Sequence, residues 1–328
     1  MKPLKFSPCL VEKVWGGEKI AAFKGVESDN ERIGESWELS AVDGNVSVVS
    51  EGPFAGRTLT DLIHEYGALV VGEKVYQATG EEFPILVKFI DARQDLSIQV
   101  HPSDNLASRI KPGMKGKTEM WYVVGASEGA HLLSGLKHDM TPEEYERRVN
   151  DGTITDALCD YPVSAGDVFF LPAGRIHAIG AGVFVAEIQE TSDITYRIFD
   201  YNRPGLDGKP RKLHTVQAEE AIDYKAVPDY RTEYSEVPDK EVQLVDCPYF
   251  NTRLLELSQD FRKDISDLDS FLIVVCTSGS GTIIAIDSDD SVSETPVRQG
   301  ETILVCATTK EVTFHPEGKM TCLAVCMD

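Results

Sequence analysis

Short apolar runs rich in β-branched and aromatic residues dominate the middle of this chain, and turn-forming residues separate them. Gly, Pro, Asp and Asn bound the runs, which predicts short strands joined by turns rather than long helices. Their regular spacing is typical of a β-sandwich or barrel. The runs are ILVKFID (85–91), LSIQVH (96–101), EMWYVVGA (119–126), AHLLSGL (130–136), DVFFLPA (167–173), VFVAEIQE (183–190) and ITYRIFDY (194–201).

Helical patterns are fewer, and a change in composition suggests two domains within the 328 residues. The best helical segments are 59–72 and 141–158, the second opening with a capping Thr, a Pro and acidic residues. Residues 217–240 are polar, charged and punctuated by proline, and a second β-rich stretch follows them. We therefore expect one domain at residues 1–235, with helical insertions, and another at 236–328.

Composition argues against several classes of partner. The chain has 32 Lys and Arg against 54 Asp and Glu, a formal net charge of −22 that repels nucleic-acid phosphates. Its first residues contain no long apolar run, so we expect neither a signal peptide nor a membrane anchor, and a cytoplasmic protein. The seven cysteines are scattered and form no CxxC motif, which favours buried reduced thiols over disulfides or a cysteine zinc site.

Four residues suit a metal site. Gln99 and His101 are two apart, so in a strand both side chains point to one face and can reach one ion. Glu119 begins the next run, and His177 ends the segment GDVFFLPAGRIH. Two imidazoles and a carboxylate suit a divalent metal such as zinc, and a glutamine carbonyl is a weaker fourth ligand. A lone histidine on a strand is more often structural, so this prediction depends on all four converging.

The residues that lead up to His177 have the spacing of a known sequence motif. Gly166, Pro172, Gly174 and His177 match the second cupin motif, whose turn lifts the histidine into the barrel mouth. Ala181 stands where that motif usually has asparagine, and Gln-Val-His replaces the His-x-His pair of the first motif.

Four blocks in order resemble type I mannose-6-phosphate isomerase (phosphomannose isomerase): LSIQVHP, KTEMWYVV, the turn ending in His177, and EIQETSDITYR. With the opening VWGG, the match is closest to the short bacterial form and covers most of residues 1–215. The resemblance implies a mainly β fold of two cupin (jelly-roll-like β-barrel) domains with a few short helices. It implies one Zn²⁺ per chain, or another divalent metal, on Gln99, His101, Glu119 and His177. The implied reaction interconverts mannose 6-phosphate and fructose 6-phosphate through an enediolate.

The same resemblance implies roles for other residues. Arg197 aligns with the family's catalytic arginine, although a strand-end salt bridge is the alternative. Glu187 and Asp193 flank that motif, where they carry protons, contact the substrate or hold Arg197 in place. Lys117 shares the strand face of Glu119 and would act in catalysis and substrate binding, unless it is simply solvated.

Substrate contacts are implied for a second group of residues. Ser97 is expected to contact the phosphate, or else a local backbone group. Trp15 would line the pocket or pack in the core. Lys209 and Arg211 lie in a basic loop that would add phosphate contacts, although here the sequence departs from longer family members.

The end of the chain echoes the cupin turn, with GETILVCATTKE in place of GDVFFLPAGRIH. In register, Cys306 replaces Pro172 and Glu311 replaces His177, and no paired histidine precedes them. We therefore expect the second domain to be a degenerate, metal-free cupin that is structural or covers the active site, with an independent binding function left open.

Alternative functions remain open at this point. The chain could isomerise free mannose or another sugar phosphate, and phosphate-contacting residues would discriminate between these substrates. It could also be a non-catalytic sugar-binding cupin. A cupin oxygenase is disfavoured, because iron oxygenases leave open the position that Gln99 would fill. We expect a monomer or homodimer acting on a small sugar phosphate.

Overall fold

A computed structural model describes residues 1–327 and confirms the mainly β fold with a few short helices. Three antiparallel sheets account for the strands. The two sheets formed by the first part of the chain have six and five strands, in the orders β10-β7-β12-β5-β3-β2 and β13-β6-β11-β8-β9. Their bounds are β2 (Cys9–Gly17), β3 (Ile33–Leu39), β5 (Ile85–Asp91), β6 (Ile98–Val100), β7 (Glu119–Ala126), β8 (His131–Leu136), β9 (Leu158–Pro162), β10 (Val168–Leu171), β11 (His177–Ile179), β12 (Val183–Glu190) and β13 (Tyr196–Phe199).

The apolar runs of the sequence become these strands. Strands β5, β7 and β12 coincide with the predicted runs at both ends, and β6, β8, β10 and β13 are shorter by one or two residues at one or both ends. Strands β3, β5 and β12 are buried along their whole length, and β5, β7 and β12 are mostly apolar because both faces of the sheet are covered. Along β7, Trp121 and Val123 pack between the six- and five-stranded sheets, whereas Met120 and Tyr122 join a cluster that reaches Phe271 in the C-terminal part of the chain.

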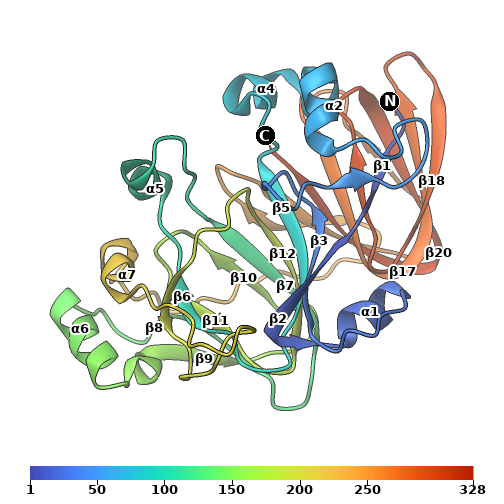
Figure 1. Ribbon diagram of the computed structural model, residues 1–328. Coiled ribbons are helices and arrows are strands. Elements are labelled where there is room, and N and C mark those ends of the chain that lie inside the picture. Colours follow the sequence, from blue (N-terminus) through green and yellow to red (C-terminus); the bar gives the residue numbers. More distant parts are fainter. Residues whose placement is uncertain (328) are drawn as a thin grey trace.

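Short helices surround the sheets. They are α1 (Lys19–Lys24), α2 (Leu59–Tyr66), α3 (Ala68–Val71), α4 (Glu73–Thr79), α5 (Asp104–Ile110), α6 (Pro142–Asn150), the 3-10 helix η1 (Ile154–Ala157) and α7 (Thr215–Ala221). The predicted helix at 59–72 is interrupted at Gly67, whose φ of 48° ends α2. The prediction at 141–158 becomes α6, capped by Thr141, followed by η1. Helices α5, α6 and α7 lie at the end of the molecule farthest from the C-terminal strands (Figure 1).

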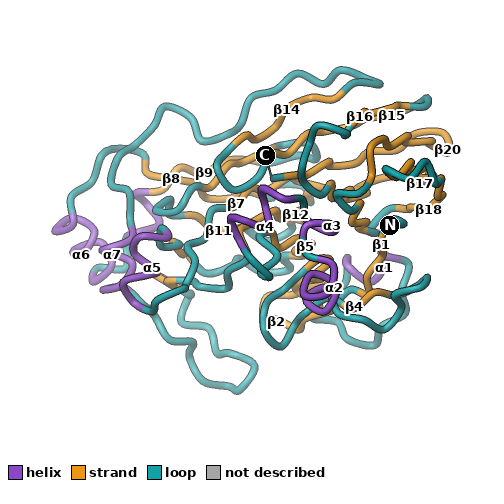
Figure 2. The backbone as a smooth tube through the Cα atoms, turned by 90° about the horizontal axis from the view of Figure 1, so that it is seen from above, coloured by secondary structure: helices purple, strands orange, loops and turns teal. Residues whose placement is uncertain are grey.

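The third sheet has nine strands and is built mostly from the C-terminal part of the chain. Strand β1, from the N-terminal end, joins this sheet by pairing Leu4 with Leu304. The N-terminus therefore lies among the C-terminal strands (Figures 1 and 2), and a domain boundary at residue 235 stays a prediction. The strands are β1 (Leu4–Ser7), β4 (Val48–Val49), β14 (Glu241–Asp246), β15 (Asn251–Leu257), β16 (Phe261–Asp264), β17 (Leu272–Asp287), β18 (Val292–Arg298), β19 (Thr302–Val305) and β20 (Thr309–Cys326).

Within residues 1–327, no helix has the length and apolar character needed to cross a bilayer.

Candidate metal centre and active site

A cavity of about 460 Å³ lies between the six- and five-stranded sheets. Its wall on the six-stranded sheet is formed by side chains of β2, β3, β5, β7 and β12, and its other wall includes Gln99 of β6 and Arg197 of β13. All three tryptophans of the chain, Trp15, Trp37 and Trp121, line it. A polar cavity with aromatic walls between two sheets is a natural place for a small polar ligand.

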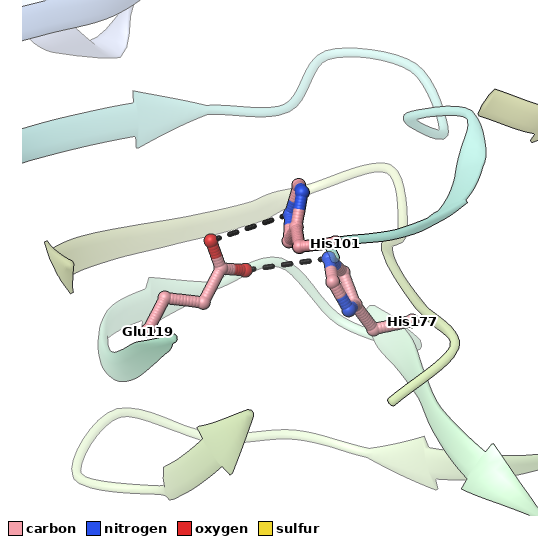
Figure 3. Close-up of side chains that lie close together, drawn as sticks. All are labelled: His101, Glu119 and His177. Carbon is pink, nitrogen blue, oxygen red and sulfur yellow. Dashed lines mark ion pairs between the residues drawn. The ribbon is translucent and has the colours of Figure 1, made fainter. Parts of the chain in front are cut away.

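Three of the predicted metal ligands meet beside this cavity. His101 directly follows β6, Glu119 begins β7 and His177 begins β11, where it pairs in register with Gln99. One ligand atom from each of the three lies within 4.8 Å of the others. The two Glu119 oxygens face one imidazole each, at 3.5 Å from His101 Nε2 and 3.3 Å from His177 Nε2 (Figure 3).

The hydrogen bonds of the imidazoles favour a cation between these groups. His101 Nδ1 lies 2.8 Å from the Ile194 carbonyl and His177 Nδ1 lies 2.9 Å from the Arg175 carbonyl. A carbonyl only accepts, so each Nδ1 must be the donor, and in a neutral ring Nε2 then carries a lone pair. Both lone pairs point at the Glu119 carboxylate, and Glu119 Oε1 is a buried oxygen without a hydrogen-bond partner. Lone pairs facing one another in this way fit a bound divalent cation.

Burial keeps the imidazoles in the form that binds metals. Desolvation, together with the nearby Lys117 ammonium, lowers the pKa of His177 to about 3 and that of His101 well below its usual value. Burial, together with the charge of Glu187, raises the pKa of Glu119 to about 7. A buried carboxylate of this kind is stabilised by a cation placed against it.

Gln99, the fourth predicted ligand, is part of the same group of side chains. Its amide nitrogen lies 3.2 Å from His177 Nε2 and donates to the lone pair there. To bind a metal, Gln99 would have to present its amide oxygen instead of its nitrogen. A 180° flip of the planar amide exchanges the positions of these two atoms.

Lys117 and Glu187 form a charged network next to the candidate ligands. The Lys117 ammonium, 3.3 Å from His101 Nε2, also hydrogen-bonds Glu119 and lies 3.9 Å from Glu187. Glu187 accepts from Lys88 at 3.2 Å and from the Trp121 indole at 3.0 Å. Lys117 is therefore buried and paired rather than solvated.

The remaining predicted residues line the cavity, with one exception. Trp15, Ser97, Asp193 and Arg197 contribute to its wall, and Arg197 Nε donates to Ser97 Oγ at 3.3 Å. No hydrogen bond or ion pair within residues 1–327 joins Arg197 to Glu187 or Asp193. In the basic loop, Arg211 lines the cavity, but Lys209 is exposed and does not.

Several other residues of the wall were not predicted from the sequence, among them Lys13, Glu35, Trp37, Lys88 and His214. Glu35 accepts from the Trp37 indole at 2.7 Å and pairs with Lys13 at 3.2 Å. Lys88 interrupts the mostly apolar strand ILVKFID, whereas Glu35 lies in IGESWEL, a buried strand that also contains Ser36 and Glu38. An ionisable residue within an apolar strand is the signal that could have found them, because burying an unpaired charge is unfavourable.

Sheets that enclose a buried His–Glu–His set define a cupin-type metal site, and comparison with known proteins identifies its family. The model of the phosphomannose isomerase type I catalytic domain matches residues 4–166. Mannose-6-phosphate isomerase ManA of Bacillus subtilis is 35% identical over 286 residues, which are 87% of this chain and 88% of that protein. The chain belongs to the type I phosphomannose isomerase family.

Two further relatives agree over nearly the whole chain. The mannose-6-phosphate isomerase of Streptococcus mutans is 31% identical over 95% of both chains. The crystal structure of mannose 6-phosphate isomerase from B. subtilis superimposes with a TM-score of 0.87 at 29% identity, covering 99% of each chain. Because the match spans both barrels, the C-terminal part belongs to the same architecture.

Proposed function

We propose that this protein is a metal-dependent isomerase that interconverts mannose 6-phosphate and fructose 6-phosphate. The observation that carries the proposal is the convergence of His101, Glu119 and His177, with one buried carboxylate oxygen left without a partner, beside a polar cavity that also contains Arg197. Family membership and the relatives' names support the substrate.

His101, Glu119, His177 and the carbonyl oxygen of Gln99 would hold the metal, and their mixture of imidazole and oxygen ligands suits Zn²⁺. When bound, such an ion polarises a carbonyl and stabilises negative charge that develops on oxygen. It would also balance the charge of Glu119, on which Lys117 and the more distant Lys88 already act.

The protein's own residues then have distinct tasks in an aldose–ketose conversion, which moves a proton between C2 and C1 through an enediolate. The Lys117 ammonium, which donates to Glu119 in the structure, would donate toward an oxygen that gains charge. Arg197 would add a second positive charge from the opposite wall. Asp193, Ser97 and Trp15 would contact the sugar phosphate and orient it.

We assign Glu187 a catalytic contribution through Lys117. Both of its oxygens accept hydrogen bonds in the structure, one from Lys88 and one from Trp121. Burial alone would raise its pKa, but Lys117 and Lys88 outweigh this effect and lower the pKa to about 2. A carboxylate that remains ionised in this way holds the Lys117 ammonium in place better than it accepts a proton.

The test is turnover of mannose 6-phosphate by purified protein, before chelation, after chelation and after re-addition of Zn²⁺. We expect activity that a chelator abolishes and Zn²⁺ restores, with one metal ion per chain by elemental analysis. Free mannose is assayed in parallel, because turnover of free mannose alone would favour the rival substrate. Absence of turnover of both sugars by the metal-loaded protein would overturn the proposal and leave a sugar-binding role.

Replacing Arg197 with Ala tests its role separately from that of the metal. We expect turnover to fall about 100-fold or more, as for removal of one group that stabilises charge in a transition state, while metal content stays at one per chain. Full activity of this variant would contradict a catalytic role for Arg197.

The proposal also carries expectations about where the protein acts and how it assembles. An acidic protein of this family would act in the cytoplasm as a monomer or homodimer, without nucleic acid. Size measurement by light scattering would decide the oligomeric state.

A further inference from the structure

Two cysteines face each other across neighbouring strands of the nine-stranded sheet, far from the active-site cavity. Strands β17 and β20 pair in antiparallel fashion (Figure 1), and their register places Cys276 directly opposite Cys322. Both side chains are fully buried and belong to one apolar cluster, so both sulfur atoms lie on the same face of the sheet. Neither forms a disulfide in the structure.

The backbone hydrogen bonds of Cys276 show how close the two cysteines are. The Cys276 amide donates to the Glu301 carbonyl at 3.0 Å, and its carbonyl accepts from the Gly300 amide at 2.9 Å. These groups lie on the β19 side of β17, and β20 is on the other side. Cys276 and Cys322 therefore form a non-hydrogen-bonded pair, in which facing Cα atoms are about 4.5 Å apart. Disulfides join Cα atoms that are roughly 4.4–6.8 Å apart.

The two thiol groups already interact. Cys276 Sγ donates to the Ser278 carbonyl at 3.5 Å, which leaves its lone pairs free to accept from the Cys322 thiol. The hydrogen bond with Cys276, and then burial, raise the pKa of the Cys322 thiol well above its usual value. The register shifts between Cys276 and Ser278, so the ladder is interrupted beside the pair and the backbone can adjust there.

No second pair of cysteines is opposed in a sheet within residues 1–327. Cys326 is buried in the same strand as Cys322, but four residues further along, which is about 13 Å. Cys306 lies in a different cluster, where its sulfur is 3.3 Å from Met1 Sδ. The opposed arrangement therefore distinguishes Cys276 and Cys322 from the other buried thiols.

We propose that Cys276 and Cys322 are a redox-sensitive pair, which a peroxide converts to a cross-strand disulfide between β17 and β20 and a thiol reductant restores. One cysteine loses its proton and attacks hydrogen peroxide, giving a sulfenic acid and one water. The second loses its proton, attacks the sulfenic sulfur and releases the second water. The two thiols lose two electrons and the peroxide gains them. This inference is independent of the proposed function.

Burial determines both the rate and the effect of this oxidation. The raised pKa of Cys322 and the apolar surroundings keep the thiolate scarce, so oxidation should be slow and should require a small oxidant. A disulfide restricts the unfolded chain, so the oxidised protein should unfold with an equilibrium constant about 30- to 1000-fold lower. The kcat/KM should stay within twofold, because neither cysteine lines the cavity.

The first test identifies the bond. Folded protein is incubated with hydrogen peroxide, alkylated, digested without reduction and analysed by tandem mass spectrometry. We expect a peptide that links Cys276 to Cys322 and disappears after dithiothreitol. Cys322→Ala should abolish it, and Cys326→Ala is the matched control, because it removes another buried cysteine of β20 and should retain the link.

The second test measures the effect on stability. Urea unfolding is recorded before peroxide, after peroxide and after dithiothreitol, so that each variant is its own reference for the cost of truncation. Only the part that dithiothreitol reverses counts, since methionine oxidation is not reversed by this thiol. Wild type and Cys326→Ala should gain stability reversibly, and Cys322→Ala should not.

Three results would overturn the inference. One is the absence of the Cys276–Cys322 peptide after prolonged incubation of the folded protein. Another is its formation only in urea concentrations that unfold the chain, because the folded register would then play no part. The third is an equal, reversible gain of stability in Cys322→Ala, which would assign the effect to other cysteines.

Discussion

The interiors of the N-terminal and C-terminal β structures are filled in opposite ways. In the N-terminal one, Lys88 and Glu187 line a polar cavity, and Glu119 and His177 are buried beside it. In the C-terminal one, the equivalent space is occupied by a cluster of aliphatic, aromatic and sulfur-containing side chains, among them Val274, Cys276, Ile283, Phe314 and Cys322. Similar sheet architectures thus support either a site or a packed core.

The difference is clearest at the positions that correspond in the two cupin-like turns. His177 points to Glu119 and is buried, whereas Glu311 pairs with the exposed Arg262 at the edge of β20. Every residue that lines the cavity lies between Val11 and His214. The C-terminal part of the chain thus contributes no residue to the cavity wall, and a purely structural role for it is a prediction that can be tested.

The largest expected effect is from His177→Ala, with Glu311→Gln as its counterpart in the second barrel. Loss of an imidazole ligand should remove the metal and lower kcat/KM by about a thousandfold or more, because the ion supplies several kcal/mol of charge stabilisation. Glu311→Gln should leave metal content and kcat/KM unchanged. Elemental analysis and steady-state kinetics measure both, and full metal occupancy in His177→Ala would contradict the assigned site.

Phe314→Ala should lower stability and leave activity nearly unchanged, the reverse of what is expected for His177→Ala. Its ring is fully buried in the C-terminal cluster, so truncation should lower the free energy of unfolding by about 3–5 kcal/mol. Below the unfolding transition kcat/KM should change less than twofold, because no residue of this cluster lines the cavity. Denaturant unfolding and kinetics on the same sample measure the two effects. Phe314→Leu, which keeps most of the volume, should destabilise less, and a large loss of activity in either variant would break the comparison.

The sequence predicted the strands well because their burial is regular. Strands β5, β7 and β12 are mostly apolar, and turn residues mark their ends, so their bounds follow from local pattern. The convergence of His101, Glu119 and His177 was predicted from strand periodicity, the cupin motif and the family resemblance, and the three residues do lie together.

The rest of the site depends on pairing between strands that are distant in sequence. Lys88 meets Glu187 because β5 pairs with β12 in register, and no local pattern connects residues 99 positions apart. The contact of Asp200 with Arg211 likewise depends on the path of the loop between them. The N-terminal strand β1 was assigned to the first domain, yet it pairs with β19, because pairing partners of a strand are not encoded in its own residues.

The smallest predicted effect is on the free energy of unfolding and concerns Glu187 and Glu190, two carboxylates of β12 with different surroundings. Glu187 is buried beside Lys88 and Lys117, whereas Glu190 accepts a hydrogen bond from the Thr118 amide at 2.6 Å. Burial, the largest cause, raises the pKa of Glu190 to about 7 from a usual value of 4.5. Since the folded pKa lies above the unfolded one, the protonated carboxyl stabilises the fold at low pH, and this contribution is lost as the pH rises from about 4.5 through 7.

Glu190→Gln should therefore stabilise the protein at pH 8 by about 1–2 kcal/mol and have little effect at pH 5, since the amide oxygen still accepts from Thr118 without carrying charge. Glu187→Gln should have the opposite sign at pH 8, because it removes the anion that pairs with Lys88 and Lys117. Urea unfolding of both variants at pH 5 and pH 8 measures the difference. Equal effects of Glu190→Gln at the two pH values would contradict a raised pKa of Glu190 in the folded protein. They would also remove the expected contrast between Glu190 and Glu187.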